Sequence, residues 1–214
     1  MPVVTEDCSG TRFDWANVDL YRFFAFVFGS PSRERFDILA QPALKDVIAD
    51  LWQRLGCAGE CPDLVWFADY EEYEAAYIAL FDVGIPEPPV PLFESAHDKT
   101  KPAQEVALEN TWFYDVLGLT WDSSRGVPDY LITQLEFLAA VRYALENAPH
   151  ASVQNLSHLE RDFLDRHMLN WVPLASAKLA RVSSSAFGSF MIMLANSLQN
   201  RRDEINQAAS NSAS

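Results

Sequence analysis

The chain has 214 residues, 49% of them apolar, which is enough to enclose one sizeable hydrophobic core without metals or disulfides. Its formal net charge is -14 and its pI is near 4.5, a balance that repels nucleic-acid phosphates and anionic lipid surfaces. We therefore expect no nucleic-acid partner and no stable membrane association, and a basic ligand is favoured. The same charge also serves simply to keep a domain in solution.

Cysteine usage and the start of the chain indicate a reducing compartment. The cysteines Cys8, Cys57 and Cys61 are odd in number, and the Cys57 to Cys61 spacing lacks the second pair of ligands that a structural zinc site needs. The chain begins without a basic region typical of an export signal, and the apolar run at 23–28 is too short to span a bilayer. We expect a cytoplasmic protein with free thiols.

Helical periodicity dominates the chain, and no run of alternating residues is bounded by hairpin turns. Glycine and proline set several expected boundaries: Gly118 as a C-cap and Pro128 at a first helical position. The pattern predicts an all-α single-domain helical bundle over residues 1–205, and a polar tail over 206–214 that is disordered. Helices are expected near residues 18–28, 34–39, 42–55, 64–81, 102–117, 128–147, 156–171, 174–182 and 184–205.

An aromatic stripe on an acidic helix runs through residues 64–81 and ends in Tyr77, Leu80 and Phe81. A stripe at this spacing usually faces the core, and a binding surface is the alternative. The prolines that follow, within 82–102, prevent regular helix and predict a fixed, extended loop. Prolines such as Pro89 flank Val90, Leu92 and Phe93, and these side chains can form an apolar wall that a basic, amphipathic peptide could line.

The helix that begins near Pro128 separates into two sides, because each residue advances about 100° around the axis. The side expected to face the core carries Leu131, Ile132, Leu135, Leu138 and Ala139. The opposite side carries Asp129, Tyr130, Thr133 and Phe137, with Glu136 on its flank. Two aromatic rings and one or two carboxylates would therefore share an outward face. Two alternatives stay open: Asp129 meets the helix dipole, and the two rings pack under the proline loop.

Common enzyme motifs are absent from the sequence, including phosphate loops, nucleophile elbows and zinc-protease motifs. Glu94 and His97 match the Glu-x-x-His unit of di-iron bundles, but such sites need a second copy and further helical glutamates. A helical metalloenzyme that uses these two residues is therefore the contrasting hypothesis. We expect no enzyme activity, no catalytic residues, no metal and no nucleotide site.

Four ordered motifs cover about half of the chain, and their combination is specific although each is weak alone. They are Tyr77-x-x-Leu80-Phe81, then Pro88-Pro89-Val90-Pro91-Leu92-Phe93-Glu94-Ser95, then Pro128-Asp129-Tyr130-Leu131 with Gln134-Leu135-Glu136-Phe137-Leu138, and finally Phe163-x-x-x-His167-Met168-Leu169-x-Trp171. With these motifs the chain resembles the redox-enzyme maturation chaperones of the TorD/DmsD/NarJ family. It is most similar to those that accompany type II DMSO reductase family enzymes for dimethyl sulfide, ethylbenzene, chlorate or selenate.

The resemblance implies an all-helical cytoplasmic chaperone that binds the twin-arginine leader and the apo catalytic subunit of a molybdoenzyme until cofactor insertion is complete. Contact with the client's molybdopterin guanine dinucleotide would be indirect, and the chaperone would be a monomer or a domain-swapped dimer. A generic peptide-binding adaptor is the alternative. The residues expected to bind the leader are Tyr77, Leu80, Phe81, Pro89, Val90, Phe93, Glu94, Asp129, Tyr130, Thr133, Glu136 and Phe137.

One position departs from the family pattern. The family usually has histidine after the aspartate, whereas this chain has Tyr130. Tyrosine keeps a ring and a hydrogen-bonding tip but does not change protonation near neutral pH. A role that depends on histidine is therefore not expected here.

Overall fold

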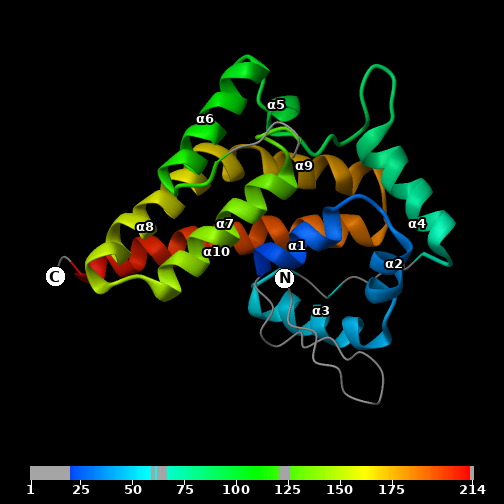
Figure 1. Ribbon diagram of the computed structural model, residues 1–214. Helices are drawn as coiled ribbons and strands as arrows, with labels where there is room; N and C mark the ends of the chain where they lie inside the picture. The colour runs from blue at the N-terminus through cyan, green and yellow to red at the C-terminus, as the bar shows by residue number, and fades with distance from the viewer. Residues whose placement is uncertain (1–19, 59–60, 62–66, 121–125, 213–214) are drawn as a thin grey trace.

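The computed structural model describes residues 20–58, 61, 67–120 and 126–212, and within these residues all regular secondary structure is helical (Figure 1). The all-α prediction is therefore confirmed. No helix of the described part is both long and apolar enough to cross a membrane. In chain order the elements are α1 (Leu20–Phe28), α2 (Arg33–Leu39), α3 (Pro42–Arg54), α4 (Tyr70–Tyr77), a π-helical turn (Ile78–Asp82), α5 (Glu94–His97), α6 (Ala103–Val116), α7 (Leu131–Asn147), α8 (His150–Phe163), a second π-helical turn (Leu164–Met168), α9 (Leu169–Val182) and α10 (Ala186–Ser212).

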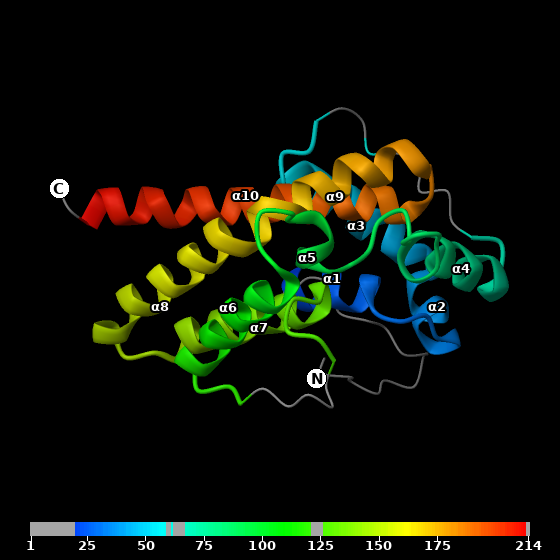
Figure 2. The same ribbon diagram turned by 90° about the horizontal axis from the view of Figure 1, so that it is seen from above.

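The long helix α10 runs through the molecule, and the other helices are arranged around it (Figures 1 and 2). Helix α1 packs against α7 and α10, and α9 packs along α10. Helix α6 lies at the outer edge above α7, while α2 and α4 lie together at the opposite end of the molecule (Figure 1). The short α5 touches both α6 and α9. This arrangement places the start of α7 beside the proline-rich segment.

Local sequence explains several of the helix boundaries. The Ser32 side chain accepts a hydrogen bond from the amide of Arg35 at the start of α2, and Asp69 accepts from Glu72 at the start of α4. Each cap satisfies an amide that the first helical turn leaves unpaired. Helix α6 ends at Val116 with Leu117 as its C-cap, and Gly118, the predicted C-cap, follows one residue later with a φ of 77°, a conformation that glycine adopts without strain.

Aromatic side chains form two buried groups in one hydrophobic core. The first surrounds Phe187 of α10, which contacts Phe28, Tyr73, Tyr77 and Phe81. Most of these rings meet edge to face or tilted, the arrangements that aromatic quadrupoles favour. The aromatic stripe of residues 64–81 is therefore core, and its first residues lie outside the described part of the chain.

The second aromatic group lies between α6, α7 and α8 and corrects one prediction. Phe137 was expected on an outward face, but it is buried against Phe113, Tyr114 and Phe163. The reason is that α7 is covered on two sides, by α1 on one and by α6 and α8 on the other, so it has no wide solvent face. A single apolar side could not be deduced for a helix packed in this way.

Several helix boundaries also differ from the prediction, among them the start of α8 at His150 rather than near residue 156 and the start of α9 at Leu169 rather than near residue 174. Helix α7 begins at Leu131, because the backbone of Asp129 and Tyr130 pairs with the proline-rich segment instead of entering the helix. Helix α5 forms inside that segment, where continuous loop was expected. Helix α10 continues to Ser212, so a disordered tail from residue 206 is wrong for residues 206–212. Ion pairs of Arg201 and Arg202 tie this helix to α8 and to the second π-helical turn just before the tail.

Truncation of Phe137 tests the second aromatic group. Phe137→Ala should lower the free energy of unfolding by about 3–5 kcal/mol, because it removes a buried ring and leaves a cavity. Urea denaturation followed by circular dichroism measures this change. Tyr143→Ala is the matched control, since Tyr143 is an exposed aromatic side chain on the same helix. Similar losses for the two variants would contradict the burial of Phe137.

Candidate functional site

The proline-rich segment and the start of α7 are joined by a short antiparallel bridge. The amide of Glu94 donates to the carbonyl of Asp129 at 3.0 Å, and the amide of Leu131 donates to the carbonyl of Leu92 at 2.9 Å. Phe93 and Tyr130 are the paired residues of this bridge. Farther back along the segment, the amide of Val90 donates to the carbonyl of Leu80 at 2.9 Å. These bonds bring three of the sequence motifs together.

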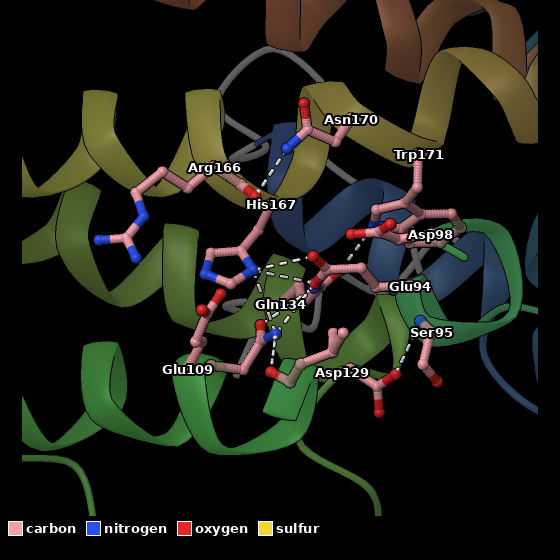
Figure 3. Close-up of polar contacts among 12 residues, drawn as sticks. Glu94, Ser95, Asp98, Glu109, Asp129, Gln134, Arg166, His167, Asn170 and Trp171 are labelled. Atoms are coloured by element: carbon pink, nitrogen blue, oxygen red, sulfur yellow. Dashed lines mark hydrogen bonds and ion pairs between the residues drawn. The ribbon is translucent and has the colours of Figure 1, made fainter. Parts of the chain in front are cut away.

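A buried polar network lies directly behind the bridge, centred on the Glu94 carboxylate (Figure 3). Its oxygens accept from Nδ1 of His167 at 2.9 and 3.0 Å, from Asn110 at 2.9 Å and from Gln134 at 2.6 Å. Trp171 extends the network by donating to the Gln134 side chain at 3.1 Å. A buried charge needs partners of this kind, because its loss of water is costly. Glu94 is thus a structural carboxylate rather than a ligand-facing one.

Asp129 also serves the fold rather than an outward face. Its carboxylate accepts from the amide of Ser95 at 3.0 Å, and the side chain is buried (Figure 3). Ser95 lies in the first turn of α5, whose own N-cap residue Phe93 provides no side-chain hydrogen bond. Asp129 therefore caps α5 from a distant part of the chain. The expectation that Asp129 points outward is wrong.

An aromatic pair remains accessible at the surface of this junction. The rings of Phe93 and Tyr130 lie 5.1 Å apart, and both side chains are partly exposed. The hydroxyl of Tyr77 donates to the carbonyl of Phe28 at 2.9 Å and lies 3.3 Å from the hydroxyl of Tyr130. Burial raises the pKa of both tyrosines above their ordinary values. The hydroxyl groups of Tyr77 and Tyr130 are therefore neutral. Their contact holds the partly exposed ring of Tyr130, and with it the aromatic pair, against the buried Tyr77.

Asp82 is the carboxylate that the structure adds to this surface. It ends the π-helical turn after Phe81, is exposed, and raises the pKa of both Tyr77 and Tyr130 through its charge. Partial burial raises its own pKa as well. Sequence reasoning missed Asp82, although an acidic residue directly after a buried aromatic stripe was a signal that could have found it.

The twelve residues predicted to bind a leader fall into two groups. Those that are buried and belong to the core or to the polar network are Tyr77, Leu80, Phe81, Val90, Glu94, Asp129 and Phe137. Those that are at least partly exposed are Pro89, Phe93, Tyr130, Thr133 and Glu136. Beside Asp82, the exposed apolar residues Ile78, Val83 and Ile85 extend this surface along the loop, and Ile85 is fully exposed. We call the accessible surface formed by Ile78, Asp82, Val83, Ile85, Phe93 and Tyr130 the loop surface.

Glu94 and His97, the two residues of the metalloenzyme hypothesis, are each bonded to other side chains or backbone groups of the protein. Glu94 belongs to the polar network, while His97 stacks on Trp171 with ring centroids 5.2 Å apart. Nε2 of His97 lies 2.7 Å from the carbonyl oxygen of Pro91, so this nitrogen donates its proton. Within the described residues, no three histidine, cysteine or acidic side chains are grouped to hold a metal ion. The geometry gives the metalloenzyme hypothesis no support.

The fold and the site together define an all-helical domain with an aromatic and acidic surface supported by a buried polar network. The chain belongs to the nitrate reductase delta subunit family, whose model matches residues 41–177. The likeness to redox-enzyme maturation chaperones that the motifs indicated is thereby confirmed. The sequence motif from Phe163 to Trp171 contributes two side chains, His167 and Trp171, to the buried polar network.

Three relatives are named as assembly chaperone proteins. Over 133 residues, the chain is 30% identical to the perchlorate reductase assembly chaperone protein of Dechloromonas aromatica (strain RCB), covering 59% of this chain and 58% of the relative. The chain is 29% identical to the selenate reductase assembly chaperone protein of Thauera selenatis, and the match covers 65% of this chain and 74% of the relative. The chain is 30% identical to the chlorate reductase assembly chaperone protein of Ideonella dechloratans, and the match covers 58% of this chain and 65% of the relative.

The match therefore spans less than two thirds of the first of these relatives. All three names describe assembly chaperones and none describes a catalyst, in agreement with the expectation that this chain is not an enzyme.

Removal of the Glu94 carboxylate tests the polar network. Glu94→Ala should cost about 3–5 kcal/mol of unfolding free energy, because His167, Asn110 and Gln134 would lose a buried partner. Urea denaturation measures the loss. Glu136→Ala removes an exposed acid from α7 and should change stability by less than about 0.5 kcal/mol. A loss below about 1 kcal/mol for Glu94→Ala would show that the network is not a major source of stability.

His97 predicts a pH dependence with a defined sign. Burial lowers the pKa of His97 in the folded protein, so the unfolded chain takes up its proton at a higher pH than the folded chain does. The stability that neutral His97 contributes is present above its ordinary pKa and is lost as the pH falls through the lowered value. The advantage of wild type over His97→Gln should therefore shrink between pH 8 and pH 5 in urea titrations. A constant difference across this range would contradict the assignment.

Proposed function

We propose that this protein is a cytoplasmic, system-specific assembly chaperone for a molybdoenzyme of the type II DMSO reductase family. It binds the twin-arginine leader and the apo catalytic subunit, assists cofactor insertion and delays export until the enzyme is mature. Membership of the nitrate reductase delta subunit family and the three relatives named as assembly chaperones support this proposal. The chaperone itself holds no cofactor, acts as a monomer, and meets molybdopterin guanine dinucleotide only through the client.

The observation that carries the proposal is the partly exposed Phe93 and Tyr130 pair together with the exposed Asp82, whose charge acts on Tyr130. A guanidinium group is planar, so it stacks on aromatic faces and also pairs with carboxylates. Both kinds of partner lie at the loop surface. Asp82 forms no ion pair within the described part of the chain, so its charge is available to an incoming cation.

The apolar part of a leader finds its partners along the same loop. Val83 and Ile85 are exposed, and Pro86, Pro88 and Pro89 restrict the backbone around them. A segment that is already rigid loses little conformational entropy when a ligand binds. We therefore place the leader's apolar stretch along the loop and its arginines at Asp82 and Tyr130.

A generic peptide-binding adaptor is the second candidate function. It would use the same acidic and aromatic surface, but it would accept any basic, apolar peptide. A surface that combines the Asp82 carboxylate with the Phe93 and Tyr130 rings favours paired arginines over lysines, because an ammonium group neither stacks as a plane nor binds a carboxylate in a bidentate manner. Discrimination between arginine and lysine therefore separates the two functions.

Calorimetry with a synthetic leader tests the proposed site. A peptide with two adjacent arginines before an apolar stretch should bind, and the same peptide with two lysines should bind at least about tenfold more weakly. Asp82→Asn should weaken binding of the arginine peptide by about tenfold, the usual loss for one charge-assisted contact. Binding should also weaken as salt is added, because the contacts are charged and exposed.

Glu146→Gln is the matched control, since it removes one negative charge from an exposed position at the far end of α7. It should leave the affinity unchanged. Equal affinity for the arginine and lysine peptides would favour the generic adaptor. No binding at tens of micromolar of either peptide would contradict leader recognition altogether.

A further inference from the structure

Helix α6 has an apolar face that no described part of the chain covers. Its buried side chains are Val106, Asn110, Phe113 and Tyr114, which point into the molecule. On the other side lie Leu108, Trp112 and Val116, which are 70%, 56% and 52% exposed. Figure 1 shows α6 at the outer edge of the molecule. Isolated exposed apolar residues are ordinary, but a contiguous group of large ones marks an interaction surface.

The three residues form one stripe because of their spacing. Steps of four residues turn the helix by about 40° each, so Leu108, Trp112 and Val116 fall within about 80° of one another. From Leu108 to Val116 the axis advances about 12 Å, at 1.5 Å per residue. Two turns of a partner helix cover that length. We call these three residues, with Glu105 and Asp115 in the same sector, the α6 face.

The α6 face is acidic as well as apolar. Glu105 and Asp115 are exposed, and neither forms an ion pair within the described residues. Helix α6 contains no lysine, arginine or histidine. The third acidic residue of the helix, Glu109, forms an ion pair with Lys101 at 2.7 Å. A partner that buries the stripe must therefore bring positive charge to the two free carboxylates.

We propose that the α6 face docks a basic amphipathic helix of the client's catalytic subunit, as a contact separate from the leader. This inference rests on the proposed chaperone function. A second copy of this chain is disfavoured as the partner, because each copy carries a net charge of -14 and the two negatively charged surfaces would repel each other. Residues 1–19 are an equally poor match in sequence, since they contain four acids and one arginine: Glu6, Asp7, Asp14 and Asp19 against Arg12.

The test uses a defined probe, an 18-residue peptide with leucines along one helical face and arginines along the other. In calorimetry with the full chain, Leu108→Ala combined with Trp112→Ala should weaken binding of this probe at least about tenfold, for two truncated apolar contacts. The matched control is Leu174→Ala combined with Val182→Ala, two α9 residues that are each 53% exposed. The control should bind like wild type. Circular dichroism checks that both double variants are folded.

A second set of variants tests whether binding requires the two carboxylates of the α6 face. Glu105→Gln combined with Asp115→Asn should weaken the leucine and arginine probe and flatten its salt dependence, because two charged contacts are lost. A probe with glutamates in place of the arginines should not bind. The α6 face is not the docking site if the apolar and acidic variants bind the basic probe like wild type, or if the glutamate probe binds equally well.

Two further results separate this inference from its alternatives. The twin-arginine leader should bind the Leu108→Ala and Trp112→Ala double variant with unchanged affinity, since its contacts lie at the loop surface. Loss of leader affinity would make the α6 face part of the leader site and overturn the separate contact. Sedimentation of the wild type as a dimer that this double variant converts to a monomer would identify a second copy as the occupant and overturn it as well.

Discussion

The buried Glu94 carboxylate is the interaction on which the rest of this structure depends. It brings together four separate parts of the chain: α5 itself, α6 through Asn110, α7 through Gln134, and the second π-helical turn through His167 (Figure 3). A carboxylate without these donors would be costly to bury, and the donors would be equally costly without the carboxylate. The polar network therefore holds only when all four parts are in place, which sets the position of α5 and α6 relative to α7.

The accessible surface follows from that constraint. Because Glu94 is held from behind, the adjacent Phe93 must lie at the surface, where the bridge pairs it with Tyr130. Asp129, the residue before Tyr130, caps α5 and so holds the other side of the bridge. An aromatic pair supported in this way is preorganised, and a ligand need not spend binding free energy on ordering it. The same network keeps the inner side of α6 packed, which leaves Leu108, Trp112 and Val116 on its outer side.

The helical class, the proline-rich segment and the chaperone family could be predicted because each depends on local pattern. Helical spacing needs no knowledge of neighbours, and the ordered motifs carry the family likeness whichever way their side chains point. The roles of Glu94, Asp129 and Phe137 could not be predicted in the same way. A surface acid and a buried, fully bonded acid look alike in a sequence, and helical angles show which residues share a side but not whether one side or two are covered.

By itself, the sequence determined an all-α chain of acidic character, a rigid proline-rich segment after an aromatic stripe, and membership of a chaperone family. Tertiary structure alone decided which acid faces the solvent. It turned Glu94 and Asp129 inward, where distant amides and a histidine satisfy them, and it left Asp82 outside beside Tyr130. The physical reason is that the burial of a charge is favourable only when partners from other parts of the chain converge on it, and that convergence is a property of the folded molecule.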